Sequence, residues 1–150
     1  MTLPVTIAEA TPADLDQVWP LARDFATSYR PEYEAYRQAY RLLSESPTAL
    51  LLLARDASGQ VCGYALSHLQ LTFLANGPVV WVEELMVDSN HRRLGVGRSL
   101  MKGVEEWARD HGAAYVSLAT RRAAPFYLAL QYDESATFFK KALLPSAPTA

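Results

Sequence analysis

Two neighbouring segments of the sequence carry groups that could do chemistry. The first is a pair of carboxylates, Glu83 and Glu84, inside an otherwise apolar run at residues 79–87. Burying such groups on an interior strand is costly unless they face a cleft, and there they could accept protons. The second is the arginine- and glycine-rich run at residues 92–98, which opens an amphipathic stretch. The two segments therefore suggest proton transfer next to anion binding.

The glycine-rich run has the features of a pyrophosphate cradle. Gly95 and Gly97 allow the backbone to approach a ligand closely. Free N–H groups of the first helical turn then point at that ligand, and the helix dipole favours an anion. Arg92, Arg93 and Arg98 add positive charge. The run differs from a Rossmann loop because it lies late in the chain and has no third glycine, and the Walker lysine pattern is absent.

Hydrophobic periodicity and turn residues predict the elements that position these groups. The sequence Thr11-Pro12-Ala13-Asp14 is typical of a helix start, and Gly112 fits the position just after a helix end. We expect a mixed α/β domain with a mainly antiparallel sheet over residues 1–143, and a disordered tail at 144–150. The predicted strands are 5–8, 49–54, 61–73, 79–87, 115–119 and 137–142; the predicted helices are 12–28, one after Pro31, 94–111 and 123–130.

The predicted second helix carries a stripe of tyrosines, at positions 29, 33, 36 and 40. One interpretation is a packing stripe whose hydroxyls reach water. The other is an aromatic wall for an acceptor substrate. The histidines, His68, His91 and His111, are interpreted as structural.

Composition narrows the class of protein. The 150 residues suit one domain, and a net charge of −2 gives no global attraction to nucleic acid or an anionic membrane. The lone Cys62 cannot form an internal disulfide, which fits a reducing cytoplasm. No Cys/His cluster has zinc-ligand spacing, so we expect no metal. No signal peptide or membrane-spanning run is evident, and we expect a cytoplasmic protein.

At the glycine-rich run the chain resembles the GNAT superfamily of acetyl-CoA-dependent N-acetyltransferases. Arg92-x-x-Gly95-x-Gly97 matches that family's acyl-CoA motif, and the preceding Leu-Met-Val-Asp matches its fourth strand. Phe126-Tyr127, followed by Leu-Ala-Leu-Gln-Tyr, resembles its closing segment. The resemblance covers roughly residues 3 to 141. It implies acetyl-CoA as co-substrate and direct acetyl transfer to a primary amine in a ternary complex.

The resemblance also implies where the cofactor lies. The fourth and fifth strands should splay apart, so that the backbone of Leu85, Met86 and Val87 can pair with the pantetheine arm like an added strand. The pyrophosphate should be held by the turn that contains Arg92, Arg93, Leu94, Gly95, Val96, Gly97 and Arg98.

The sequence departs from the family pattern at two positions. Thr120 stands where an asparagine that contacts the cofactor is usual, and Gln131 replaces the glycine after the short helix. Gln131 must adopt that turn without glycine's freedom, or the turn differs. The adjacent Arg121 and Arg122 either touch the cofactor phosphates or form a solvated pair.

Catalysis requires a base, because an amine with a pKa near 10.4 is almost entirely protonated at pH 7. The resemblance favours Glu83 as that base, with Glu84 as the alternative, and strand alternation predicts that the two point to opposite faces. Tyr127 matches the family's general acid, which would protonate the departing thiolate. The alternative for Tyr127 is a core tyrosine packed beside Phe126.

The acidic strand residues suggest a small cationic amine as acceptor. The alternatives are a protein N-terminus or lysine, or a non-catalytic acyl-CoA sensor. A nucleic-acid-binding role for the arginines is disfavoured by the net charge and the glycine turn. A homodimer is possible.

Overall fold

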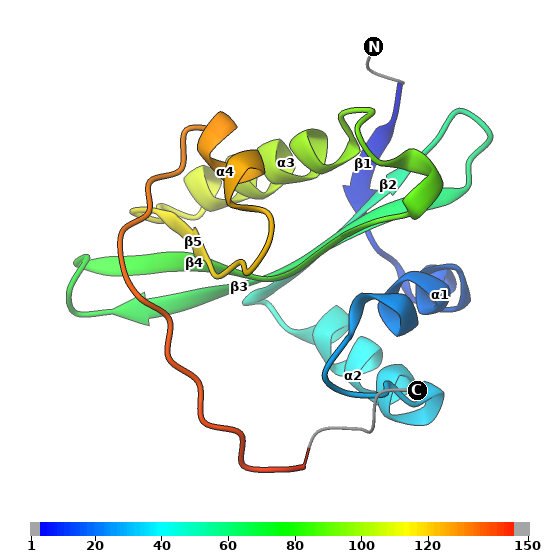
Figure 1. Cartoon of the computed structure of the whole chain (residues 1–150), viewed down its shortest axis with the longest axis horizontal. Helices are drawn as coiled ribbons and strands as arrows, with labels where there is room; N and C mark the ends of the chain where they lie inside the picture. Colours follow the sequence, from blue (N-terminus) through cyan, green and yellow to red (C-terminus); the bar gives the residue numbers. More distant parts are fainter. Residues whose placement is uncertain (1–3, 146–150) are drawn as a thin grey trace.

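The computed structural model describes residues 4–145 and contains a five-stranded sheet with helices on both sides (Figure 1). The strands lie side by side in chain order, antiparallel throughout except for the parallel pair β4–β5. The strands are β1 (Thr6–Glu9), β2 (Ala49–Arg55), β3 (Val61–Thr72), β4 (Gly77–Val87) and β5 (Val116–Leu118); the α-helices are α1 (Leu15–Phe25), α2 (Tyr33–Glu45), α3 (Val96–Asp110) and α4 (Ala124–Ala129). The predicted fold class is confirmed.

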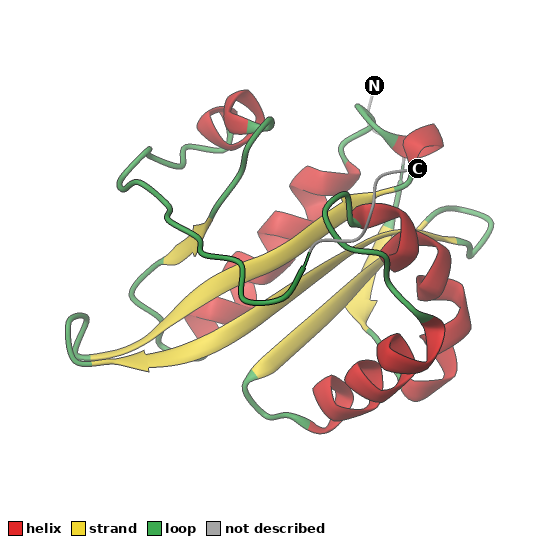
Figure 2. Ribbon diagram, turned by 60° about the horizontal axis from the view of Figure 1, so that its bottom comes forward, coloured by secondary structure: helices red, strands yellow, loops and turns green. Residues whose placement is uncertain are grey.

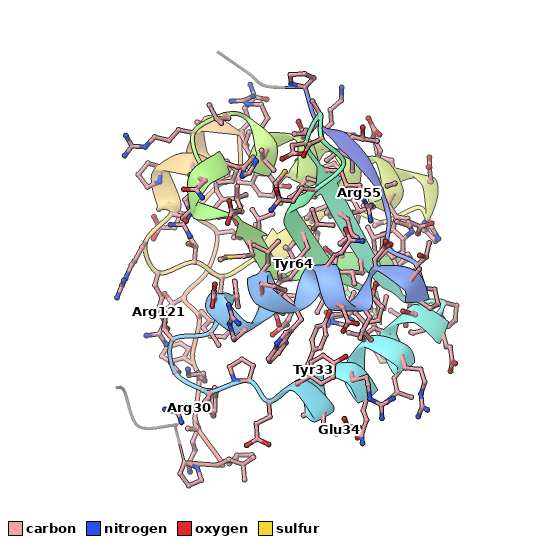
Figure 3. All side chains as sticks on the ribbon, turned by 90° about the vertical axis from the view of Figure 1, so that its right-hand side faces the viewer. Arg30, Tyr33, Glu34, Arg55, Tyr64 and Arg121 are labelled. Carbon is pink, nitrogen blue, oxygen red and sulfur yellow. The ribbon has the colours of Figure 1, made fainter. Side chains whose placement is uncertain are left out.

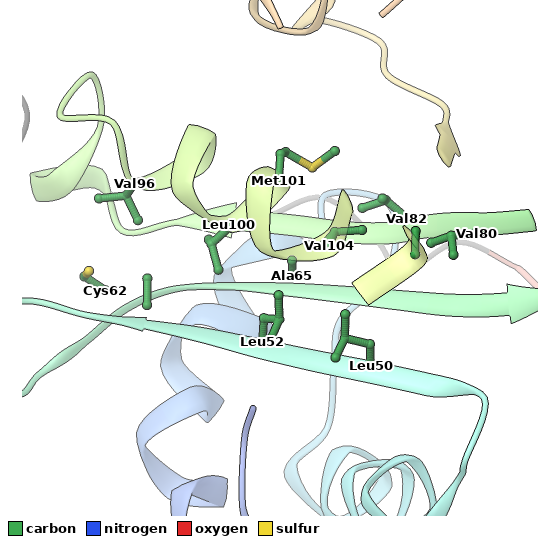
Figure 4. Packing of buried hydrophobic residues seen from close by; sticks show 12 residues of the cluster. Leu50, Leu52, Cys62, Ala65, Val80, Val82, Val96, Leu100, Met101 and Val104 are labelled. Atoms are coloured by element: carbon green, nitrogen blue, oxygen red, sulfur yellow. The ribbon is translucent and has the colours of Figure 1, made fainter. Parts of the chain in front are cut away.

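The sheet separates two layers of helices. The long helix α3 covers one face, and α1 with α2 covers the other (Figures 1 and 2). Leu100, Met101 and Val104 of α3 are completely buried in one cluster with Leu50 and Ala65 of the sheet; Leu100 points toward the sheet and Met101 points away from it (Figure 4). On the opposite face, Val18 and Leu21 of α1 pack with Tyr40, Leu53 and Tyr64. We call these the α3 face and the α1/α2 face.

Two glycines allow α3 to lie very close to the sheet. A Cβ atom at Gly103 would lie 2.8 Å from Cδ1 of Leu52, and one at Gly63 would lie 3.2 Å from Cδ1 of Leu100 and from Cγ1 of Val96 in α3. Neither distance is compatible with a side chain unless the neighbouring atoms move. This close packing fixes the start of α3 relative to the end of β4.

The tyrosine stripe of α2 serves packing. The hydroxyls of Tyr33, Tyr36 and Tyr40 each donate a 2.6 Å hydrogen bond, to the Asp16 carboxylate, the Leu15 carbonyl and the Thr11 carbonyl respectively. These bonds tie α2 to the start of the first helical segment, so the hydroxyls do not reach freely into water. That segment begins as predicted at Pro12, as a 3₁₀ turn (Pro12–Asp14), and ends at Phe25 rather than 28.

Gln131 adopts the turn that glycine usually makes. Its φ is +69°, in the left-handed region. The amide of Gln131 donates to Leu128 and the amide of Tyr132 donates to Tyr127, both at 3.0 Å, which is the Schellman pattern of a helix end. The turn therefore has the shape that a glycine would give it. Placing glutamine in this left-handed conformation costs roughly 1 kcal/mol of backbone strain.

The predicted last strand, 137–142, is wrong. Residues 133–145, which we call the C-terminal segment, contain no helix or strand. A strand needs a neighbour for its backbone N–H and C=O groups, and β5 at the sheet edge is only three residues long. The C-terminal segment instead runs from α4 past the β5 edge towards the α1/α2 side (Figure 1). Of the tail expected to be disordered, residues 146–150 lie outside the described residues.

Among residues 4–145, none of the helices combines the length and the apolar character needed to cross a lipid bilayer.

Candidate active site

Strands β4 and β5 pair over only three residues and then separate. The parallel register joins Val80 to Val116 and Val82 to Leu118, and no β5 pairing continues beyond this in the described chain. The second half of β4, residues 83–87, therefore has an unpaired edge. An extended ligand can add to such an edge through backbone hydrogen bonds. The expected splay is present, and Leu85, Met86 and Val87 lie along it.

A β-bulge changes the orientation predicted for the acid pair. Leu66 of β3 pairs with Glu84, and the next residue, Ser67, pairs with Val82, so Glu83 is the extra residue of β4. Val82 and Leu85 both pack on the α3 face. The two residues between them, Glu83 and Glu84, consequently share the α1/α2 face. The expectation of opposite faces is wrong because a bulge breaks strict alternation.

Glu84 is half-buried and held by a tyrosine. The hydroxyl of Tyr64 donates a 2.7 Å hydrogen bond to Oε1 of Glu84, and Tyr64 lies between the sheet and α1 (Figure 3). Burial raises the pKa of Glu84 above its ordinary value, and the neighbouring Glu83 adds to this; the bonds and charges of Tyr64 and His68 act in the opposite direction without cancelling the rise. A carboxylate with a raised pKa is a stronger proton acceptor near neutral pH.

Glu83 lies in a different environment. It is exposed, and its Oε2 accepts a 2.7 Å hydrogen bond from the indole N–H of Trp81. The Trp81 ring in turn stacks on Phe138 of the C-terminal segment, with ring centroids 6.2 Å apart and planes inclined by 19°. Glu83 is thus a solvent-facing carboxylate fixed beside two aromatic rings.

The loop after β4 shapes the predicted phosphate cradle. Arg93 and Gly95 both have left-handed backbone angles, φ +65° and +86°, and α3 begins at Val96. Left-handed residues in such a turn help to direct neighbouring N–H groups to one side, and the first turn of α3 adds amides without intrahelical acceptors. Arg92, Arg93 and Arg98 are exposed there, and Nε of Arg92 donates to the Val87 carbonyl at 3.2 Å. These residues fit a diphosphate.

Gly97 lies where the cradle meets α4. A Cβ atom at this position would lie 3.1 Å from Cζ of Phe126 and 3.7 Å from Cγ2 of Val87. Helix α4 therefore approaches the first turn of α3 through the Phe126 ring, and a side chain at position 97 would require that ring to move. Leu94 is half-buried and Val96 is fully buried, so their side chains pack while their backbone faces the cradle.

The side chain of His91 links the beginning of this loop to the β2–β3 turn. Nδ1 of His91 lies 2.8 Å from Oδ2 of Asp88, and Nε2 lies 3.1 Å from Oδ2 of Asp56 in the β2–β3 turn. Both ring nitrogens face carboxylate oxygens, so the protonated imidazole satisfies both partners. The hydrogen bond to Asp88 and the contacts with Asp56 raise the pKa of His91 above its usual value, in spite of some burial.

Tyr127 differs from the other sheltered tyrosines of the described chain. The hydroxyls of Tyr36, Tyr40, Tyr64 and Tyr132 all donate to a protein acceptor, whereas that of Tyr127 makes no hydrogen bond there. Its ring packs edge-on against Phe126, with centroids 4.9 Å apart. Burial raises the pKa of Tyr127, which keeps the phenol protonated at neutral pH. The residue therefore offers an unused proton donor from α4.

The loop between β5 and α4 carries the remaining predicted cofactor residue. The hydroxyl of Thr120 accepts a 3.1 Å hydrogen bond from the amide of Ala123, so its side chain shapes the entry into α4. Arg121 and Arg122 are exposed in the same loop, and Arg121 points outward from the molecule (Figure 3).

Sequence reasoning does not single out three aromatic residues that the structure brings to the carboxylate pair: Tyr64, Trp81 and Phe138. Tyr64 and Trp81 resemble ordinary strand aromatics, and Phe138 falls in a predicted strand that does not form. Only Trp81 has a usable signal, because it stands two residues before Glu83 and i, i+2 strand residues share a face.

Comparison with known proteins supports the fold and shows the family. Residues 15–132 match the family model described as acetyltransferase (GNAT) family. The chain is 30% identical to an aminoalkylphosphonate N-acetyltransferase of Salmonella typhimurium, with 91% of this chain and 90% of that protein covered. It is 28% identical to a type 1 aminoglycoside N(6')-acetyltransferase of Stenotrophomonas maltophilia, over 95% and 96%.

A structural relative shows the same fold at low sequence identity. Glucosamine-6-phosphate N-acetyltransferase from Arabidopsis thaliana superposes with a TM-score of 0.82 at 15% identity, covering 93% of this chain and 99% of that one. The chain belongs to the GNAT acetyltransferase family and is an acetyltransferase of that type.

Proposed function

We propose that this protein transfers the acetyl group of acetyl-CoA directly to a primary amine of a small molecule. The observation that carries the proposal is the separation of β4 and β5 after Val82 and Leu118. This separation leaves one edge of β4 without a partner strand. The carboxylate pair lies at the start of that edge, and the proposed phosphate cradle follows the end of β4. The named relatives act on an aminoglycoside and an aminoalkylphosphonate, both of which carry amines.

Acetyl-CoA would supply the activated acyl thioester. The cradle from Arg92 to Arg98 would hold the pyrophosphate through backbone amides and arginine charge, and the unpaired edge at Leu85, Met86 and Val87 would align the pantetheine arm. Thr120 would shape the neighbouring loop through its bond from the Ala123 amide, and its O–H is still available to donate to the cofactor.

We assign the base to Glu84 rather than Glu83. Glu84 is half-buried, its pKa is raised, and its hydrogen bond from Tyr64 occupies only one carboxylate oxygen. The other oxygen is left to accept a proton from the acceptor ammonium, directly or through one water. Glu83 is exposed and already bonded to Trp81. The neutral amine then attacks the thioester carbonyl.

Tyr127 is assigned as the proton donor to the departing thiolate. Its hydroxyl is free of protein partners, and its raised pKa keeps the proton in place until negative charge develops nearby. Such a donor contributes about 10²- to 10⁴-fold in rate.

The experiment that tests this function is a turnover screen of the purified full-length chain. Acetyl-CoA is incubated with a library of primary amines, thiol release is followed, and acetylated products are identified by mass spectrometry. We expect an amine-dependent release of thiol with a matching N-acetyl product. Tight acetyl-CoA binding without turnover of any amine would instead assign the chain to acyl-CoA sensing.

A further inference from the structure

The two carboxylates on the α1/α2 face are suited to different tasks. The attacking nitrogen must lose a proton, and Glu84 is half-buried with one carboxylate oxygen not used by Tyr64, where burial raises its pKa and makes it a better proton acceptor. Glu83 is exposed, so a cation can reach its carboxylate from solvent. One carboxylate is therefore placed to remove a proton, and its neighbour is placed to meet a cation.

The surroundings of Glu83 are those of a site for a cation. The Trp81 indole N–H holds one carboxylate oxygen at 2.7 Å, which fixes the direction of the charge and leaves the other oxygen free. Trp81 stacks on Phe138, and Phe138 is 59% exposed, so aromatic surface borders the carboxylate. Ammonium groups bind to carboxylates and also to the faces of tryptophan and phenylalanine rings.

The bulge places the carboxylate proposed to bind a cation directly beside the carboxylate proposed to take the proton. Glu83 and Glu84 are adjacent in sequence and point to the same face because Glu83 is the extra residue opposite the Leu66–Ser67 step. A small acceptor can therefore present one nitrogen to Glu84 while a second nitrogen reaches Glu83. A monoamine would use only the first contact.

We infer that the preferred acceptors are diamines or polyamines, in which a second, protonated amino group binds at Glu83, Trp81 and Phe138 while the reacting amine lies at Glu84. This inference rests on the proposed function and names its substrate class. Phe138 enters the site from the C-terminal segment, so that segment contributes directly to acceptor recognition. An acceptor with an anionic second group would be repelled by Glu83.

The test compares acceptors that differ only in the second group: 1,3-diaminopropane, propylamine and 3-aminopropylphosphonate. For the full-length chain we expect kcat/KM to be highest for the diamine and lowest for the aminophosphonate. Glu83→Gln should reduce kcat/KM for the diamine roughly tenfold through KM, the low end for a charged hydrogen bond at an exposed site, and leave propylamine within about twofold. Equal effects on diamine and monoamine, or a preference for the aminophosphonate, would overturn the inference.

Aromatic variants provide matched controls. Phe138→Ala should raise KM for the diamine, whereas Phe139→Ala should not, because Phe139 is 87% exposed and no aromatic stacking involves it in the described chain. Trp81→Phe keeps a ring and removes the donor to Glu83. An unchanged diamine KM in Phe138→Ala would remove that residue from the site.

A binding measurement separates this inference from the proposed function. Calorimetric titration of 1,3-diaminopropane into the protein with coenzyme A should show an affinity that Glu83→Gln weakens. Absence of all acetyl transfer would refute the proposed function, even with such binding. Turnover of amines with no Glu83-dependent diamine binding would refute the inference alone.

Discussion

The hydroxyl of Tyr64 donates a 2.7 Å hydrogen bond to Oε1 of Glu84, and so connects β3 to the half-buried carboxylate of β4. The bond orients Glu84 on the face that α1 partly covers. The pKa of Glu84 is nevertheless raised, because burial outweighs the stabilisation that Tyr64 gives to the anion. A group in that state weakens the fold at neutral pH, and in the proposed mechanism it is the better proton acceptor there.

Glu84→Gln should therefore stabilise the protein and slow it. When the pKa of a carboxyl is higher in the folded than in the unfolded protein, the protein loses stability as pH rises from the unfolded to the folded pKa. The wild type should show this loss, and the variant, which has no carboxyl at position 84, should not. We expect a higher Tm for the variant at pH 7, an unchanged Tm near pH 4, and a fall in kcat/KM of about 10²-fold.

Glu83→Gln is the matched control for that prediction. The Glu83 charge contributes to the raised pKa of Glu84, so its amide variant should reduce the fall in Tm with pH without abolishing it, and should lower monoamine turnover far less than Glu84→Gln does. If Glu83→Gln rather than Glu84→Gln abolishes monoamine turnover, the assignment of the base is reversed.

Tyr127→Phe should reduce kcat by about 10²-fold while Tm and acetyl-CoA affinity stay near the wild-type values. The reason is that the substitution keeps the ring on Phe126 and removes only a hydroxyl that has no protein partner in the described chain. Tyr132→Phe is the opposite control, because its hydroxyl donates to Glu105 at 2.8 Å. It should lower Tm slightly and leave kcat unchanged. A kcat within twofold of wild type in Tyr127→Phe, with chemistry rate-limiting, would assign Tyr127 to the core.

Gly97→Glu should abolish acetyl-CoA binding in a folded protein. A side chain there would meet the Phe126 ring, which a Cβ atom already approaches to 3.1 Å, and its charge would oppose the pyrophosphate. Gly97→Ala tests the steric part alone and should weaken binding less. Calorimetry measures both, with Lys102→Glu, an exposed position further along α3, as a control for charge. Unchanged acetyl-CoA affinity in Gly97→Glu would show that this turn does not bind the pyrophosphate.

The His91 contacts should make the protein more stable below neutral pH than above it. The raised pKa of His91 means that the protonated imidazole stabilises the fold fully below the unfolded pKa of about 6.5, and that this contribution is lost as pH rises through the folded value. Thermal unfolding at pH 6 and pH 8.5 should show a decrease in Tm for wild type. The decrease should be smaller in His91→Gln, and an equal decrease in both would show that His91 does not contribute.

Much of the fold follows from local patterns. The helical period from 94 to 111, the Pro12 helix start and the turn at Gly112 predicted their elements within a few residues, because each signal acts on neighbouring atoms. The glycine-rich turn is of the same kind: the positive φ of Gly95 and the amides of α3 are properties of the segment itself.

The faces and partners of the site were decided by tertiary structure. The sequence determined that two carboxylates lie on one apolar strand, but the bulge opposite Leu66 and Ser67, a property of two paired strands, put them on one face. Burial by α1 and the Tyr64 bond then distinguished Glu84 from Glu83. Residues 133–145 include strand-like residues, yet within the described chain they pair with no strand, and Phe138 stacks on Trp81. Composition and spacing fix what a segment can form alone, whereas pairing register and burial depend on residues far apart in the chain.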